Sequence, residues 1–162
     1  MKEFTFPYVW IERKYRQECL QYTDTSFGIR LKFDDGIDYD LIHQVNKLVL
    51  YLRKNYYFPV RCNICITNHR RYHSKVDGHI YYGIFYDNAD VCPKRKIYPQ
   101  IFVAGQLWEH RETDDVLFAI LHELTHYYQW FFDEEEKRTD RSLEIEANKW
   151  AQYILDRFRD NK

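Results

Sequence analysis

The feature that most constrains this chain is the segment His122-Glu123-Leu124-Thr125-His126, a H-E-x-x-H pattern between apolar flanks. The flanking residues, 116–121 and 127–130, are mostly apolar or aromatic and predict one continuous helix. Residues four apart lie on the same face of a helix, about 40° apart around its axis. His122 and His126 can therefore direct two imidazoles at one ion, and Glu123 can reach a water on that ion without binding it.

This spacing is typical of the helix of a zinc peptidase, in which the glutamate acts as general base. A catalytic zinc usually has three protein ligands, so a third must come from elsewhere. A helix predicted over residues 141–159 offers Glu144 and Glu146, which two-residue spacing places on nearly opposite faces. We favour Glu146, because it adjoins Ala147 on the packed side, whereas Glu144 lies near the start of the helix.

The remaining segments predict an α+β domain. Residues 38–56 have an apolar face at helical spacing, with Asp38 or Asp40 as cap. Strands are expected at about 60–67, 79–86 and 100–104. The active-site helix follows, from Thr113 as cap to about residue 132. The order is therefore a backing helix, a small mixed sheet of three or more strands, the active-site helix and a C-terminal helix that carries the glutamate ligand.

Residues 1–36 form an extension of uncertain role in what we expect to be a single domain, 1–162. Phe4 to Trp10 alternate as in a strand broken at Pro7, residues 12–20 indicate a helix or an arm, and residues 28–33 alternate again. We favour additional sheet or a packing arm over a segment that covers the active site.

Two of the four cysteines, Cys62 and Cys65, form a C-x-x-C pattern that can mark a metal or redox site. They lie in a segment that alternates as a strand does, and residues three apart on a strand point to opposite faces. They are therefore expected to be separate thiols, not ligands of one ion.

Composition excludes several classes of function. The formal net charge is −1, which argues against nucleic-acid binding through the basic residues Arg70, Arg71, Lys94, Arg95 and Lys96. No apolar run approaches the roughly 20 residues of a membrane span, and the first residues do not form a signal peptide. We expect a cytoplasmic monomer with no membrane partner.

The motif "LHELTHYYQ" together with "EIEANKWAQYIL" resembles the gluzincin clan of zinc metallopeptidases, and specifically the ImmA/IrrE-type intracellular peptidases and minimal gluzincins. The resemblance covers roughly residues 38–159 in element order, although only the two short motifs are specific. It implies a zincin-like fold with zinc held by His122, His126 and Glu146, and with Glu123 as the base. It also implies that the strand at 79–86 forms an antiparallel edge to which a substrate chain adds as a further strand.

Two departures from the larger, thermolysin-like members bear on the mechanism. Those enzymes carry an acid four residues after the glutamate ligand, where this chain has Trp150. They also have a downstream histidine that stabilises the transition state. The weak candidate for that role here is Tyr153, although a packing role is favoured for it.

The sequence thus predicts a zinc metalloendopeptidase that acts on protein or peptide substrates, among which the resemblance makes a transcription regulator plausible. The alternative is a zinc-binding regulatory protein of the same fold with little or no turnover.

Overall fold

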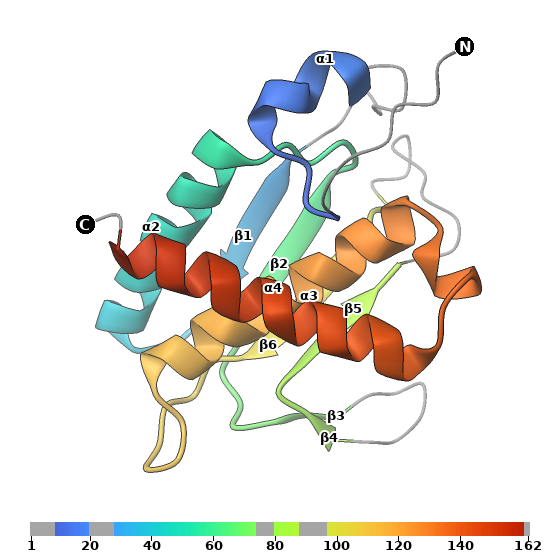
Figure 1. Ribbon diagram of the computed structural model, residues 1–162. Helices are drawn as coiled ribbons and strands as arrows, with labels where there is room; N and C mark the ends of the chain where they lie inside the picture. Colours follow the sequence, from blue (N-terminus) through green and yellow to red (C-terminus); the bar gives the residue numbers. More distant parts are fainter. Residues whose placement is uncertain (1–8, 20–27, 74–79, 88–96, 161–162) are drawn as a thin grey trace.

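The computed structural model describes residues 9–19, 28–73, 80–87 and 97–160. Three long helices and a four-stranded mixed sheet make up most of this part of the chain, which confirms the α+β class (Figure 1). The first described residues contain a 3-10 turn, η1 (Arg13–Tyr15), and a short helix, α1 (Arg16–Cys19). The expected strand between Phe4 and Trp10 lies largely outside the described residues.

The sheet has the strand order β1-β2-β6-β5. Strands β1 (Ile29–Phe33), β2 (Cys62–Thr67) and β6 (Gln100–Ala104) are parallel. Strand β5 (Gly83–Tyr86) is antiparallel to β6 and lies at the edge. The strand expected at 79–86 is divided, because a bend at Tyr82 separates β5 from β4 (Ile80–Tyr81), which pairs with β3 (Tyr72–His73) in a small second sheet.

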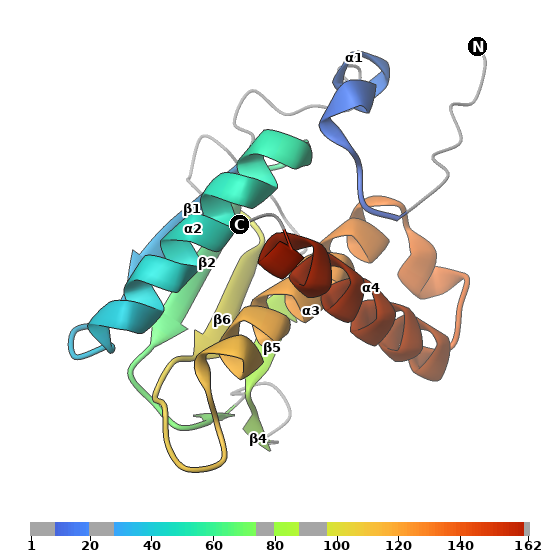
Figure 2. The same cartoon turned by 60° about the vertical axis from the view of Figure 1, so that its left-hand side comes forward.

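Helix α2 (Tyr39–Asn55) connects β1 to β2, and its N-terminus is capped by Asp38, whose side chain accepts a hydrogen bond from the backbone N–H of Leu41. Helices α2 and α3 (Thr113–Phe131) cover one face of the sheet, and α4 (Asp140–Asp160) packs on the outside of α3 (Figure 2). A turn of 3-10 helix, η4 (Glu134–Glu136), connects α3 to α4. The predicted cap Thr113 is wrong by one residue: the cap is Glu112, which forms a capping box with Asp115.

The core lies between the sheet and the helices. Strand register places alternate residues of the three parallel strands on the helix-covered face, where most of them are buried. The members of this row are Ile29, Cys62, Ile64, Ile66, Ile101 and Val103. Cys62 is buried in it, whereas Cys65 lies on the other face and is half-buried, as the alternation predicts.

Part of the described N-terminal extension packs into the core. Trp10 and Ile11 are buried, and the indole N–H of Trp10 donates to Oγ1 of Thr125 at 3.0 Å. Strand β1 adds to the sheet. Among the described residues of the extension, the packing role is therefore confirmed. No helix in the described ranges has both the length and the apolar character that a membrane crossing requires.

Candidate metal centre

Helix α3 presents the H-E-x-x-H residues from its middle turns. Its apolar residues are buried against the sheet and α4, while His122 and His126 lie half-buried on a neighbouring stripe. Their imidazole Nε2 atoms are 3.1 Å apart, with the ring planes inclined at 83°. The helical spacing therefore brings both rings to one point, as the sequence predicts.

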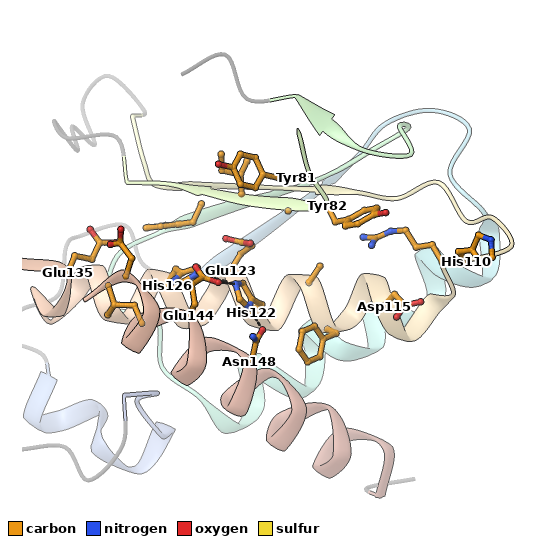
Figure 3. A pocket seen from close by; sticks show the side chains of 18 residues that line it. Tyr81, Tyr82, His110, Asp115, His122, Glu123, His126, Glu135, Glu144 and Asn148 are labelled. Carbon is orange, nitrogen blue, oxygen red and sulfur yellow. Dashed lines mark hydrogen bonds and ion pairs between the residues drawn. The ribbon is translucent and has the colours of Figure 1, made fainter. Parts of the chain in front are cut away.

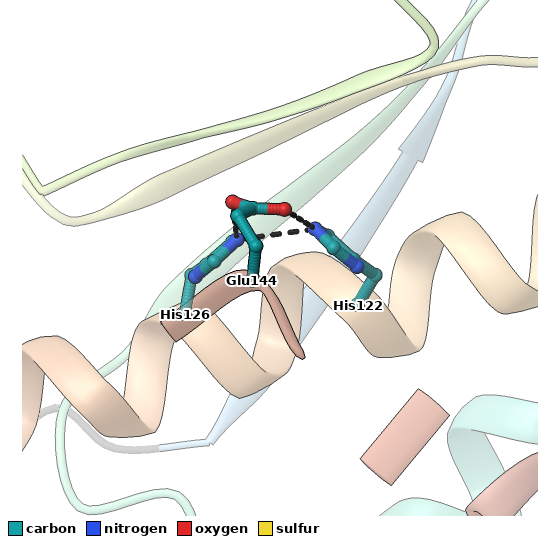
Figure 4. Close-up of side chains that lie close together, drawn as sticks. All are labelled: His122, His126 and Glu144. Carbon is teal, nitrogen blue, oxygen red and sulfur yellow. Dashed lines mark hydrogen bonds and ion pairs between the residues drawn. The ribbon is translucent and has the colours of Figure 1, made fainter. Parts of the chain in front are cut away.

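A carboxylate from α4, that of Glu144, joins the two imidazoles to form the metal group, His122, His126 and Glu144. The two oxygens of Glu144 lie 3.1 Å from Nε2 of His122 and 2.9 Å from Nε2 of His126 (Figure 4). All three ligand-type atoms lie within 4.8 Å of one another, so the group can hold a metal ion. In the described part of the chain, no other group of three histidine, cysteine or acidic residues has this arrangement.

The structure brings Glu144, and not the favoured Glu146, to the two imidazoles. Helix α4 begins at Asp140, so Glu144 is already in its second turn and not at a frayed end. The two glutamates flank the seam of α4 that packs against α3, which contains Leu143, Ala147 and Ala151. Glu144 lies on the side of this seam that faces His122 and His126.

Glu146 lies on the other side of the seam, where it forms an ion pair at 2.8 Å with Arg138. The same carboxylate oxygen accepts a hydrogen bond at 3.0 Å from Nε2 of Gln129. That amide nitrogen also donates to the backbone carbonyl of Leu143 at 3.0 Å. Both partners are acceptors, so they fix which end of the Gln129 amide is the donor.

The outward ring nitrogens of the two histidines each contact a side-chain amide oxygen. Nδ1 of His126 lies 2.7 Å from Oε1 of Gln129, and Nδ1 of His122 lies 2.9 Å from Oδ1 of Asn148. An amide oxygen only accepts, so Nδ1 carries the proton in both rings and Nε2 carries the lone pair. Hydrogen bonds of this kind orient the imidazoles of metal sites and raise their basicity as ligands.

Two Nε2 lone pairs that face each other at 3.1 Å repel, and a cation between them would relieve that repulsion. Burial lowers the pKa of His122, and a charge on the neighbouring His126 lowers it further, while the carboxylate of Glu144 and the hydrogen bond that Nδ1 donates to Asn148 raise it. The net shift is downward, so the site disfavours the protonated form of His122. A metal ion would supply the positive charge between the two Nε2 atoms.

Glu123 lies beside this group and is buried between α3 and the edge strand. Burial, with a smaller contribution from the charge of Glu144, raises the pKa of Glu123 to about 8. A bound cation acts in the opposite direction. Gly83 of β5 lies against this side chain: a Cβ added there would be 3.2 Å from Cγ and 3.3 Å from Oε1 of Glu123. The strand thus passes directly over the carboxylate.

The group opens into a cleft of about 920 Å³ between β5 and the two helices α3 and α4 (Figure 3). Residues Tyr81 to Phe85 line one wall, and Glu123, His122 and His126 line the other. Glu135 lies near one end of the cleft, and His110 and Asp115 near the other (Figure 3). Gly83, Ile84 and Phe85 of β5 contribute to its wall, so a chain that paired with β5 would run beside the imidazoles and Glu123.

Tyr153, the weak candidate for stabilising a transition state, does not line this cleft. It is 48% exposed on α4, its hydroxyl accepts a hydrogen bond from Arg157, and it borders a separate small pocket with Trp10 and Trp150. Apart from the two histidines, the described side chains with donor groups that line the cleft are Tyr81, Tyr82, His110, Arg111 and Asn148.

Two residues of the site were missed by sequence reasoning. Asn148 lies four residues after Glu144, the offset at which the thermolysin-like enzymes carry their supporting acid, so choosing Glu144 would have identified it. Gln129 lies three residues after His126 on the same stripe of α3, which is a signal in itself. Its link to Glu146 across the helix pair has no sequence signal.

No protein-family model, curated protein or solved structure matched this chain.

Proposed function

We propose that this protein is a zinc-dependent metallopeptidase that hydrolyses peptide bonds with Glu123 as general base. One observation carries the proposal: the two imidazole Nε2 atoms and the Glu144 carboxylate converge beside a second, buried carboxylate, at the wall of an open cleft. The H-E-x-x-H motif and the resemblance to gluzincins of the ImmA/IrrE type support the same function.

The donor set fits zinc. Ligand atoms at about 2.0–2.2 Å from a tetrahedral zinc lie about 3.3–3.5 Å from one another. The two Nε2 atoms are 3.1 Å apart, and each faces a different oxygen of Glu144, at 3.1 Å for His122 and 2.9 Å for His126. With one ligand atom from each residue, the three atoms lie within 4.8 Å of one another. Two neutral imidazoles and one carboxylate leave a fourth position free, as in catalytic zinc sites. When bound there, zinc would polarise the scissile carbonyl and lower the pKa of a water.

The residues of the chain supply the proton transfers. Glu123 would accept the proton of the attacking water on a carboxylate oxygen and deliver it to the nitrogen of the leaving amine. Its burial excludes bulk water from the carboxylate, and Gly83 limits where the side chain can lie. Asn148 and Gln129 would hold the two imidazoles in the tautomer that presents Nε2.

The substrate would be a protein or peptide bound in extended form. Strand β5 is at the edge of its sheet, and its outer edge borders the cleft above α3. Backbone groups of an edge strand can pair with an incoming chain as a further strand. The ImmA/IrrE resemblance makes a transcription regulator a candidate substrate.

The test is the variant Glu123→Gln, compared with the exposed control Glu136→Gln. Zinc content is measured by atomic absorption, and cleavage of unfolded casein and of a peptide library is measured by mass spectrometry. The Glu123 variant should retain stoichiometric zinc and lose about 10²–10⁴-fold in cleavage rate, while the control should behave as the wild type. Full activity in Glu123→Gln contradicts the assignment of the base. Stoichiometric zinc without cleavage by the wild type favours a zinc-binding regulatory protein instead.

A further inference from the structure

Arg111 is a buried cation in the wall of the cleft. It lies between β6 and the start of α3, lines the cleft and is only 5% exposed. Its Nη2 donates to the carbonyl oxygen of Ala104 at 3.0 Å, and its Nε is buried without a hydrogen-bond partner among the described residues. A guanidinium offers five N–H donors, and the one side-chain hydrogen bond that it forms with the described residues is the one to Ala104.

No described carboxylate neutralises this charge. The nearest acid in electrostatic terms is Asp115, whose charge raises the pKa of Arg111, but burial outweighs this effect and the pKa is lowered. Asp115 forms no ion pair with Arg111; its Oδ2 accepts the backbone N–H of Glu112 at 2.8 Å in the capping box. A buried charge without a counter-ion is unfavourable, and a bound anion would relieve that cost.

The guanidinium of Arg111 lies over the ring of Tyr82, with Cζ 4.5 Å from the ring centroid. A planar guanidinium can stack on an aromatic ring by its face while its edge binds a carboxylate through two hydrogen bonds. Tyr82 is 43% exposed and lies at the bend where the edge strand begins, on the cleft (Figure 3). The pair therefore lies where an extended chain on β5 would pass.

Arg111 lies too far from the two imidazoles and Glu144 to act on the scissile bond, so its position fits a role in substrate recognition. Asp115, at the same end of the cleft, precedes His122 by seven residues of α3, which corresponds to about 10 Å along the helix. That is about three residues of an extended chain. A group at this separation contacts the substrate away from the scissile bond.

We propose that Arg111, stacked on Tyr82, forms a carboxylate-binding subsite, so that the preferred substrates carry an acidic side chain or a free C-terminal carboxylate a few residues from the scissile bond. This inference rests on the proposed peptidase function, because only a peptidase would cleave the bound chain. The binding of a carboxylate at Arg111 does not itself require turnover. The carboxylate would accept hydrogen bonds from the guanidinium edge that has no acceptor among the described residues.

The binding test uses the variant Glu123→Gln, which excludes turnover, and two acetylated hexa-alanine probes, one a free acid and one an amide. A third probe is the amide with one glutamate, moved through the six positions. The readout is the Nε–H resonance of Arg111 in ¹⁵N NMR spectra, assigned by its loss in Arg111→Lys. The free acid, or one glutamate position, should shift this resonance and bind about tenfold more tightly than the neutral amide. The two probe series separate a terminal carboxylate from an acidic side chain.

Two variants complete the test. Arg111→Gln should abolish the preference for the carboxylate while binding the amide unchanged. Asp115→Asn retains a capping acceptor, removes a negative charge beside the subsite and should strengthen carboxylate binding. Equal binding of acid and amide probes by the protein with Arg111 intact overturns the proposal, even if Arg111→Gln fails to fold. Carboxylate binding without cleavage by the wild type would uphold this subsite while the proposed peptidase function fails.

Discussion

Oδ1 of Asn148 lies 2.9 Å from Nδ1 of His122, so the same helix that brings Glu144 to the metal group also orients one of its imidazoles. The two α4 residues are four apart and therefore act from one face. Helix α4 therefore supplies one proposed ligand, Glu144, and the side chain that orients another, His122.

The variant Asn148→Ala should weaken zinc binding by about 10–100-fold, because the His122 ring loses the acceptor that fixes its tautomer. Affinity is measured by competition with a chromophoric chelator. Asn148→Asp retains an acceptor and should retain the affinity, and Asn46→Ala, an exposed asparagine on α2, serves as the matched control. Unchanged affinity in Asn148→Ala would show that the contact does not support the metal.

The variants Glu144→Gln and Glu146→Gln separate the ligand from its neighbour. In Glu144→Gln the affinity for zinc should fall by more than the factor of about 10–100 that residues supporting the ligands contribute, because the substitution removes a direct ligand. Glu146→Gln should still bind zinc stoichiometrically, although more weakly, since Glu146 acts only through Gln129 and Arg138. Zinc content after dialysis is measured by atomic absorption. The reverse pattern would restore the ligand set that the sequence favoured.

The metal-free protein should become less stable as the pH rises, through Glu123. The pKa of this carboxyl is about 8 in the folded state, against an ordinary value of 4.5, so its stabilising contribution is present below about pH 4.5 and is lost as the pH rises toward 8. The slope is up to about 1.4 kcal/mol per pH unit.

Glu123→Gln removes this titration, so its free energy of unfolding in urea, relative to that of the wild type, should increase from pH 5 to pH 8 in the presence of a chelator. His122, whose pKa is lowered, contributes in the opposite direction but is common to both proteins. A constant difference between the two proteins across this range would contradict the burial of an ionisable Glu123. Excess zinc should largely suppress the effect.

The variant Gly83→Ala tests the contact between the edge strand and the base. The added methyl group would be 3.2 Å from Cγ of Glu123, so that side chain has to shift by a few tenths of an ångström. We expect kcat to fall by about tenfold, because catalytic groups tolerate little displacement, while zinc content stays the same. Thermal unfolding monitored by circular dichroism checks that the fold is retained. Wild-type kcat would show that Glu123 adjusts freely.

Trp10 should stabilise the active-site helix through its burial. Trp10→Ala creates a cavity beside Tyr56, Phe58 and Tyr128 and should cost about 3–5 kcal/mol of the free energy of unfolding. Trp10→Phe should cost less, because Oγ1 of Thr125 still donates to the carbonyl of Leu121. Urea denaturation measures both values. A small effect of Trp10→Ala would show that the N-terminal segment does not contribute to the core.

Much of the fold follows from local patterns. The apolar face of residues 38–56 predicts α2, and alternation predicts β1, β2 and β6, because side-chain period reports directly on which surface is buried. The sequence predicts one strand over residues 79–86 and not its division at Tyr82. A bend at one of two adjacent tyrosines leaves the alternation of side chains almost intact. The capping residue was also misplaced by one position, because three consecutive polar residues, Glu112 to Asp114, can each serve as a cap.

The sequence by itself determined that His122, Glu123 and His126 share one helix and that its two imidazoles converge, because a helical period of 3.6 residues fixes which side chains are neighbours. Only the tertiary structure decided between Glu144 and Glu146, and identified Asn148, Gln129 and Arg111. Local period fixes the faces of a helix but not its rotation about its own axis. The packing of the α4 seam against α3 sets that rotation, and it depends on contacts between residues distant in sequence.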